Sequence, residues 1–93
     1  MGVVIKRGGK RQAFSPSKIK NSILGAAKEA KLNSAKAKEL VKEVGDSVIN
    51  FYKDKRTVKV SAIRKSILGR LNRRAKSVSR AWRAYEARRK NSN

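Results

Sequence analysis

The chain has 93 residues, which is the usual length of one domain. It carries 26 Lys and Arg residues against 6 Asp and Glu residues, a formal net charge of +20, and it has neither Cys nor His. Disulfides and thiolate metal sites are therefore excluded, and the commonest general base and metal ligand is missing. No apolar run approaches the roughly 20 residues of a transmembrane helix. Because the N-terminus turns polar after Val3-Val4-Ile5, we expect no signal peptide. We expect a single basic domain over residues 1–93, located in the cytoplasm.

The charge is densest in the last third of the chain. Residues 1–57 carry 14 basic and 5 acidic residues, whereas residues 58–93 carry 12 basic residues and 1 acidic residue. Such an excess repels itself unless a polyanion neutralises it, and nucleic acid is the commonest polyanion in a cell. High charge also occurs in disordered chains, but apolar periodicity runs through almost the whole sequence.

The N-terminal half predicts a hairpin followed by two helices. Two short extended runs, 3–6 and 10–14, flank Gly8-Gly9, which suits a tight turn. Ser15 can cap a helix that has Pro16 at its first position. The apolar stripe of this helix is Ile19, Ile23, Leu24, Ala27 and Ala30. A second helix is expected over residues 35–52, with Ala37, Leu40, Val41, Val44, Val48 and Tyr52 facing the core.

The C-terminal half predicts one strand and two further helices. Residues 57–60 are expected to form the strand, and Ser61 to cap a third helix whose inward residues are Ile63, Ile67, Leu68 and Leu71. Residues 72–74 are expected to form a turn, and a last helix covers about 77–90 with Val78, Trp82 and Tyr85 on its apolar side. The fold class is therefore α+β, in the order β-β-α-α-β-α-α.

This pattern resembles a known family. The opening Val4-Ile5-Lys6-Arg7-Gly8-Gly9-Lys10-Arg11-Gln12-Ala13-Phe14, continued by Ser15-Pro16-Ser17-Lys18-Ile19, is similar to the start of an ATP-cone domain. Residues 58–63 resemble the family's third strand and following helix start, and residues 82–89 its closing helix, so that the resemblance covers roughly residues 3–90. ATP cones are small regulatory domains that bind ATP or dATP, found at the N-terminus of ribonucleotide reductases and in a zinc-ribbon repressor of reductase genes. The implied fold is a bundle of about four helices covered by a small three-stranded sheet.

The resemblance also implies a nucleotide site. By their positions in the motif, Val4, Lys6 and Arg7 would contact the nucleotide, and Lys18 would contact its phosphates. Arg64 occupies a position where the family often has a polar or histidine side chain, and Arg88 lies near a basic position of the closing helix. Lys and Arg both suit phosphate oxygens, and the helix that starts near Ser15 adds backbone donors. The alternative is that these are ordinary surface charges. Two family carboxylates that help to hold adenosine are replaced, by Gly8 and by Gln12.

A second group of basic residues is not a family requirement. A basic hairpin and a helix with a basic stripe can follow phosphates along a duplex or a structured RNA. The alternative is a solvated face that serves only solubility. Aromatic residues such as Trp82 and Tyr85 could stack on bases, although their stripe with Val78 favours core packing. The candidate nucleic-acid contacts are Lys10, Arg11, Arg73, Arg74, Lys76, Arg80 and Arg83.

Two functions follow from these patterns. The favoured one is a nucleic-acid-binding protein, bound to ribosomal or other structured RNA or to chromosomal DNA with little sequence preference. The alternative is a stand-alone ATP- or dATP-binding module that regulates a separate partner protein. No nucleophile lies beside a base, so we expect no enzyme activity, no metal and no required cofactor, with ATP or dATP as a possible ligand. Related cones often self-associate, so self-association stays open, and a membrane partner ranks last because the apolar faces are needed for the core.

Overall fold

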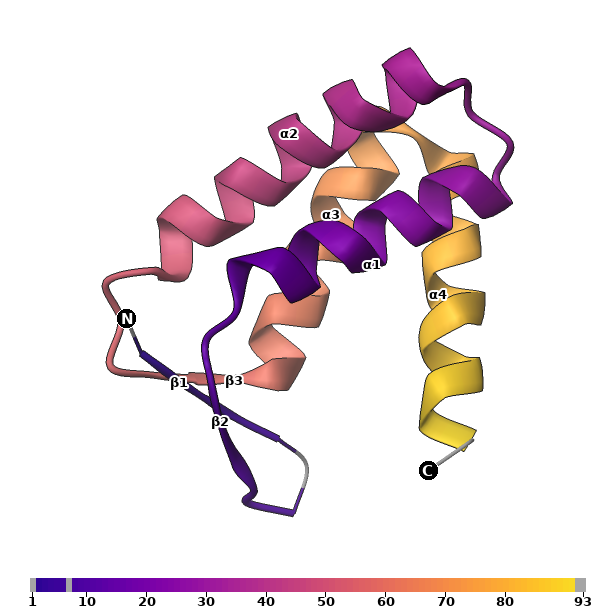
Figure 1. Cartoon of the computed structure of the whole chain (residues 1–93). Coiled ribbons are helices and arrows are strands. Elements are labelled where there is room, and N and C mark those ends of the chain that lie inside the picture. The colour runs from indigo at the N-terminus through magenta and orange to yellow at the C-terminus, as the bar shows by residue number, and fades with distance from the viewer. Residues whose placement is uncertain (1, 7, 92–93) are drawn as a thin grey trace.

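A computed structural model of the chain describes residues 2–6 and 8–91, with side chains described through Arg88. Four helices make up most of the molecule: α1 (Pro16–Glu29), α2 (Ser34–Tyr52), α3 (Val60–Arg74) and α4 (Lys76–Asn91). Three short strands, β1 (Val3–Ile5), β2 (Arg11–Ala13) and β3 (Thr57–Lys59), form a sheet at one end of the helices (Figure 1). The predicted α+β class and element order are confirmed. No helix within this described part is long and apolar enough to cross a bilayer.

The sheet has the order β2-β1-β3. β1 pairs antiparallel with β2 through the predicted hairpin, and Gly8 and Gly9 both have the positive φ that this turn needs, 87° and 85°. β1 pairs parallel with β3, so that Val4 lies between Gln12 and Val58. The sheet therefore fixes the hairpin beside the start of α3.

The helices enclose an apolar core to which every helix contributes. Ile23 of α1, Val48 of α2, Leu71 of α3 and Val78 of α4 are all fully buried. α1 packs against both α2 and α4, and α3 packs against both α4 and α2, so the four helices surround this core. The predicted stripes are largely right, although Leu24, Val41 and Leu68 are only partly buried.

The helix ends correct the sequence prediction at two places. α3 begins at Val60, directly after Lys59, and no side chain caps it, so the prediction that Ser61 is the cap is wrong. The parallel pairing of β1 and β3 ends at Lys59, which lets the helix start one residue later. The predicted turn at 72–74 is also wrong, because α3 continues to Arg74 and only Ala75 leaves helical geometry. Cationic residues in a last helical turn are favourable, which explains why Arg73 and Arg74 extend α3.

The first two helix starts follow the sequence prediction closely. The Ser15 hydroxyl accepts a hydrogen bond from the Lys18 amide at 3.4 Å, with Pro16 in the first position. α2 starts at Ser34, one residue earlier than predicted, because the Asn33 side chain caps it.

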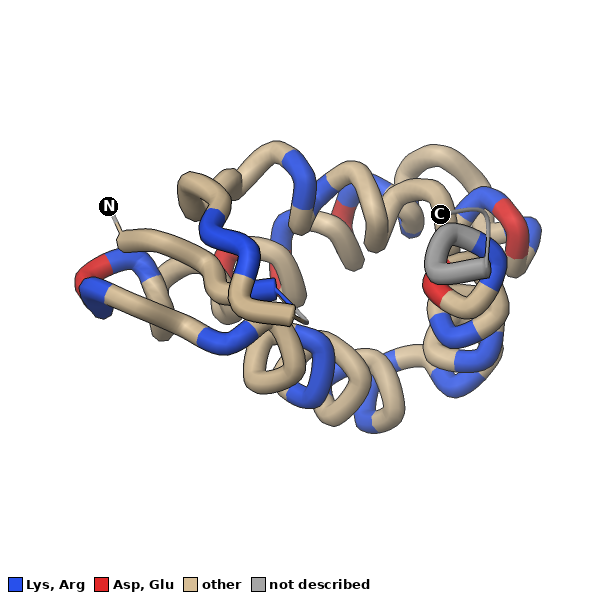
Figure 2. Tube along the Cα trace, turned by 90° about the horizontal axis from the view of Figure 1, so that it is seen from below, with Lys and Arg blue, Asp and Glu red and all other residues tan. Residues whose placement is uncertain are grey.

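Charge is distributed over the whole molecule. Figure 2 shows Lys and Arg positions along every helix, with the few acidic positions scattered among them. Among the described residues, four acids form ion pairs between helices: Asp46 with Lys20 (3.1 Å), Glu43 with Arg74 (2.5 Å), Glu86 with Arg64 (3.9 Å) and Glu29 with Arg88. Two of these acids, Glu43 and Asp46, lie on α2 and link it to α3 and α1.

Candidate nucleotide site

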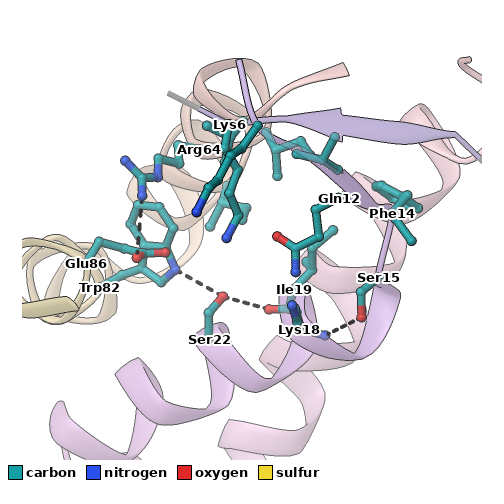
Figure 3. A pocket seen from close by; sticks show the side chains of 16 residues that line it. Lys6, Gln12, Phe14, Ser15, Lys18, Ile19, Ser22, Arg64, Trp82 and Glu86 are labelled. Atoms are coloured by element: carbon teal, nitrogen blue, oxygen red, sulfur yellow. Dashed lines mark hydrogen bonds and ion pairs between the residues drawn. The ribbon is translucent and has the colours of Figure 1, made fainter. Parts of the chain in front are cut away.

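A cavity of about 710 Å³ lies between the hairpin and three of the helices. Val4 of β1, Gln12 of β2 and Phe14 line its sheet side, while α1, α3 and α4 supply the remaining walls (Figure 3). Pockets for drug-sized ligands usually measure about 300–1,000 Å³, so a nucleotide is of a suitable size.

Four cationic side chains surround this cavity. Lys6 follows β1, Lys10 precedes β2, Lys18 lies in the first turn of α1, and Arg64 lies on α3. Lys6 and Arg64 lie on one side in Figure 3, whereas Lys18 lies across the cavity beside Ser15. The first turn of α1 holds no acid, so the positive end of its dipole adds to the attraction for an anion. The lining therefore suits a phosphate group.

One carboxylate lies among these cations. Glu86 of α4 forms an ion pair with Arg64 of α3, with 3.9 Å between Arg64 Nη2 and Glu86 Oε2. The Glu86 side chain is only 16% exposed, whereas that of Arg64 is 41% exposed. Glu86 thus orients the guanidinium at the cavity and leaves much of it available. Arg64 can offer its remaining N–H groups to a bound anion.

The cavity floor is tied together by a buried hydrogen-bond chain. The Trp82 indole N–H donates to the Ser22 hydroxyl at 3.3 Å, and that hydroxyl donates to the Ile19 carbonyl at 2.8 Å. Trp82 is 2% exposed and Ser22 is 6% exposed. This chain links α4 to α1 below the cavity, and Trp82 is the only tryptophan of the sequence.

The structure brings together most of the residues predicted for the nucleotide site. Val4, Lys6, Lys18 and Arg64 all line the cavity. Arg88 does not, because it pairs with Glu29 on α1. The remaining member of the prediction, Arg7, lies outside the described residues.

The predicted nucleic-acid group is not one surface. Lys10 lines the cavity, and it lies with Arg11 on the hairpin at the sheet end. Arg73, Arg74 and Lys76 lie at the junction of α3 and α4, at the opposite end of α3 (Figure 1). A helix of this length spans about 20 Å, so the hairpin and the junction cannot contact one short stretch of phosphates together.

Several residues of the cavity were not predicted for the nucleotide site, among them Lys10, Ser22, Trp82 and Glu86. Ser22 and Trp82 are 60 residues apart, and no local pattern pairs them. Glu86 could have been found, because it is the single acid among residues 58–93 and lies one turn beyond Trp82.

The fold and the cavity define a small α+β domain with a cationic, nucleotide-sized site between a hairpin and a helical bundle. The family model of the ATP cone domain matches residues 2–91, nearly the whole chain, and the protein belongs to this family. ATP cones are regulatory rather than catalytic domains, and they bind ATP or dATP as effectors. No curated protein matches the chain.

Proposed function

We propose that this domain binds ATP or dATP in the cavity and acts as a regulatory module on a partner protein. The observation that supports this best is the convergence of Lys6, Lys10, Lys18 and Arg64 on one cavity that contains a single carboxylate. A multiply charged anion such as a polyphosphate matches this cluster, because an uncharged ligand would leave the four cations repelling one another.

The remaining lining residues suit the nucleoside part of the ligand. Val4 and Phe14 offer apolar surface for a base, and the Gln12 amide can both donate and accept hydrogen bonds. Gln12 stands where relatives of this fold often carry a carboxylate, so its hydrogen bonds to the nucleoside are weaker, neutral ones. We expect affinity to depend mainly on the phosphates.

Calorimetry with ATP at about 0.15 M salt tests the proposal, and quenching of Trp82 gives a second signal from the cavity wall. Lys18→Gln removes one cation from the cavity, and Lys42→Gln removes one exposed cation from α2 as the matched control. A hydrogen bond to a charged group contributes about 1.5–3 kcal/mol, so Lys18→Gln lowers affinity about 10- to 100-fold. Lys42→Gln leaves it nearly unchanged. Absence of heat at millimolar ATP, or an equal loss in both variants, contradicts the proposal.

A further inference from the structure

Of the basic side chains that the structure describes, four line the cavity, and the outer face of the α3–α4 pair carries five others. Contacts define this face by elimination. On α3, Ile67 and Leu71 face the core, Asn72 faces α4 through its bond with Ser79, and Arg74 faces α2 through Glu43. The side left over carries Lys65, Gly69 and Arg73, which are spaced four residues apart.

The same argument holds for α4. Val78 and Trp82 face the core, Ser79 faces α3, and Arg88 faces α1 through Glu29. The outward side carries Lys76, Arg80 and Arg83, at spacings of four and three residues, all exposed. α3 and α4 are joined by Ala75 alone and pack against each other, so the two rows meet at the junction, where Arg73 and Lys76 are three residues apart.

The outer face is defined as Lys65, Gly69, Arg73, Lys76, Arg80 and Arg83. Glu43 of α2 lines a small pocket with Arg73, but its ion pair is with Arg74, and no acid among the described residues pairs with a member of the face. Glu86 is the single acid of residues 58–93, and it faces the cavity on the other side of α4. Within the described part of the chain, no hydrogen bond or ion pair engages the five basic side chains. They are therefore available to an external anion.

The arrangement opposes the stability of α4. Lys76 stands at the positive end of the helix dipole, where a cation is unfavourable, and the first turn holds no acid. Lys76 and Arg80, four residues apart, repel each other along the helix, as do Arg80 and Arg83, three apart. These residues weaken their own helix and form no hydrogen bond or ion pair with the described residues, which points to a partner that neutralises them.

We infer that the outer face binds the phosphate backbone of a nucleic acid, at a site separate from the nucleotide cavity. Two rows of cations on adjacent helices suit a regular line of phosphates. The face carries no large apolar side chain, whereas a membrane-binding helix needs Trp, Phe or Leu on its buried side. Gly69 has open space around it, so a backbone can approach α3 closely there.

Fluorescence anisotropy with a duplex of about 20 base pairs, titrated with salt, tests this inference. The triple variant Lys76→Gln/Arg80→Gln/Arg83→Gln removes three cations from the outer face. The matched control, Lys36→Gln/Lys38→Gln/Lys42→Gln, removes three exposed cations from α2 and leaves the same net charge. The titration is carried out with a DNA duplex and, in parallel, with an RNA duplex, so that the result shows which of the two nucleic acids binds.

Each phosphate contact contributes about 0.9 to the slope of log affinity against log salt. The outer-face variant therefore lowers the slope by about 2.7 and the affinity at about 0.1 M salt by several hundred-fold, while the control shows a much smaller loss. Lys76→Gln alone weakens binding without lowering the melting temperature, because it removes an unfavourable cation from the start of α4.

Four results would overturn the inference. The two triple variants could lose affinity equally, which would leave net charge as the whole explanation. The wild type could fail to bind either duplex. Anionic vesicles or polyglutamate could bind the outer face as tightly as the duplexes do, which would indicate a different partner. Saturating ATP could displace the duplex, which would place the duplex in the cavity and leave the proposed nucleotide site intact.

Discussion

Removal of the Ser22 hydroxyl is expected to destabilise the domain through its effect on Trp82. In Ser22→Ala the indole N–H, now paired at 3.3 Å, loses its acceptor in a place where Trp82 is 2% exposed. A buried donor left unsatisfied costs about 1–3 kcal/mol. Ala recovers about 0.5 kcal/mol of helix propensity. The net loss is therefore about 1–2 kcal/mol, a fall in melting temperature of roughly 5–15 °C for a domain of this size.

Ser47→Ala is the matched control for this loss. Ser47 also donates to a carbonyl of its own helix, that of Glu43 at 2.8 Å, but it is exposed and accepts nothing from Trp82. We expect Ser47→Ala to be neutral or slightly stabilising, because such back-bonding weakens a helix. Thermal and urea unfolding followed by circular dichroism measure both changes.

A double-mutant cycle isolates the hydrogen bond. In the Trp82→Phe background the ring has no N–H, so Ser22→Ala there should cost nothing further. If Ser22→Ala behaves as Ser47→Ala does, or if its cost persists beside Phe, the buried hydrogen bond is not what holds α4 to α1.

Three further predictions concern backbone strain and charge. Lys31 follows α1 and has a φ of 63°, a conformation that favours glycine. Lys31→Gly should therefore raise the free energy of unfolding by about 0.5–1 kcal/mol. Lys31→Ala removes the same charge and should give no such increase. A Cβ at Gly2 would lie 1.9 Å from the Lys55 carbonyl oxygen, so Gly2→Ala should destabilise by about 1–3 kcal/mol, whereas Gly25→Ala, inside α1 with open space, should stabilise slightly. Raising salt from about 0.1 M to about 1 M should raise the melting temperature because it screens the net charge. Unfolding curves check all three, and a fall with salt would show that the ion pairs outweigh the repulsion.

Much of the fold could be predicted from the sequence because its determinants are local. Gly8-Gly9 between extended runs specifies the hairpin, and Ser15 with Pro16 specifies the start of α1. The apolar spacing of the helices then fixes which faces are buried. The end of α3 was missed because Asn72, Arg73 and Arg74 suit a turn and a last helical turn equally well. The burial of Leu71 favours the continued helix over the turn. This burial depends on residues far away in the sequence, so the local pattern does not reveal it.

Residues of the candidate site could be predicted from the sequence only where they belong to a local motif. Lys6 and Lys18 belong to the opening pattern, so the sequence indicated both. The Arg64–Glu86 pair and the Ser22–Trp82 bond join distant segments, and their partners depend on how α4 packs against α1 and α3. The residues predicted to contact nucleic acid are divided between two places for the same reason, since the hairpin and the junction of α3 and α4 lie at opposite ends of α3.

α4 lies between the two proposed sites. Its width therefore determines how strongly the charges bound at one site repel those bound at the other. Its inner side faces the cavity with Trp82 and Glu86, and its outer side carries Lys76, Arg80 and Arg83. A helix is about 10–12 Å wide with its side chains, so phosphates bound on either side lie roughly 15 Å apart. At physiological salt the screened repulsion over that distance is about 0.04 kcal/mol for each pair of charges.

About a dozen such pairs, between a triphosphate and three backbone phosphates, give roughly 0.5 kcal/mol, which is about a twofold effect on affinity. We therefore expect saturating ATP to weaken duplex binding by about twofold if α4 stays in place. The duplex anisotropy titration, repeated over a range of ATP concentrations, measures this factor. In the control variant Lys18→Gln, the same factor should appear only at about 10- to 100-fold higher ATP. A change of tenfold or more exceeds what screened charges can supply, so it would contradict two separate sites on either side of a fixed α4: either the duplex occupies the cavity, or the helix moves when the cavity is filled.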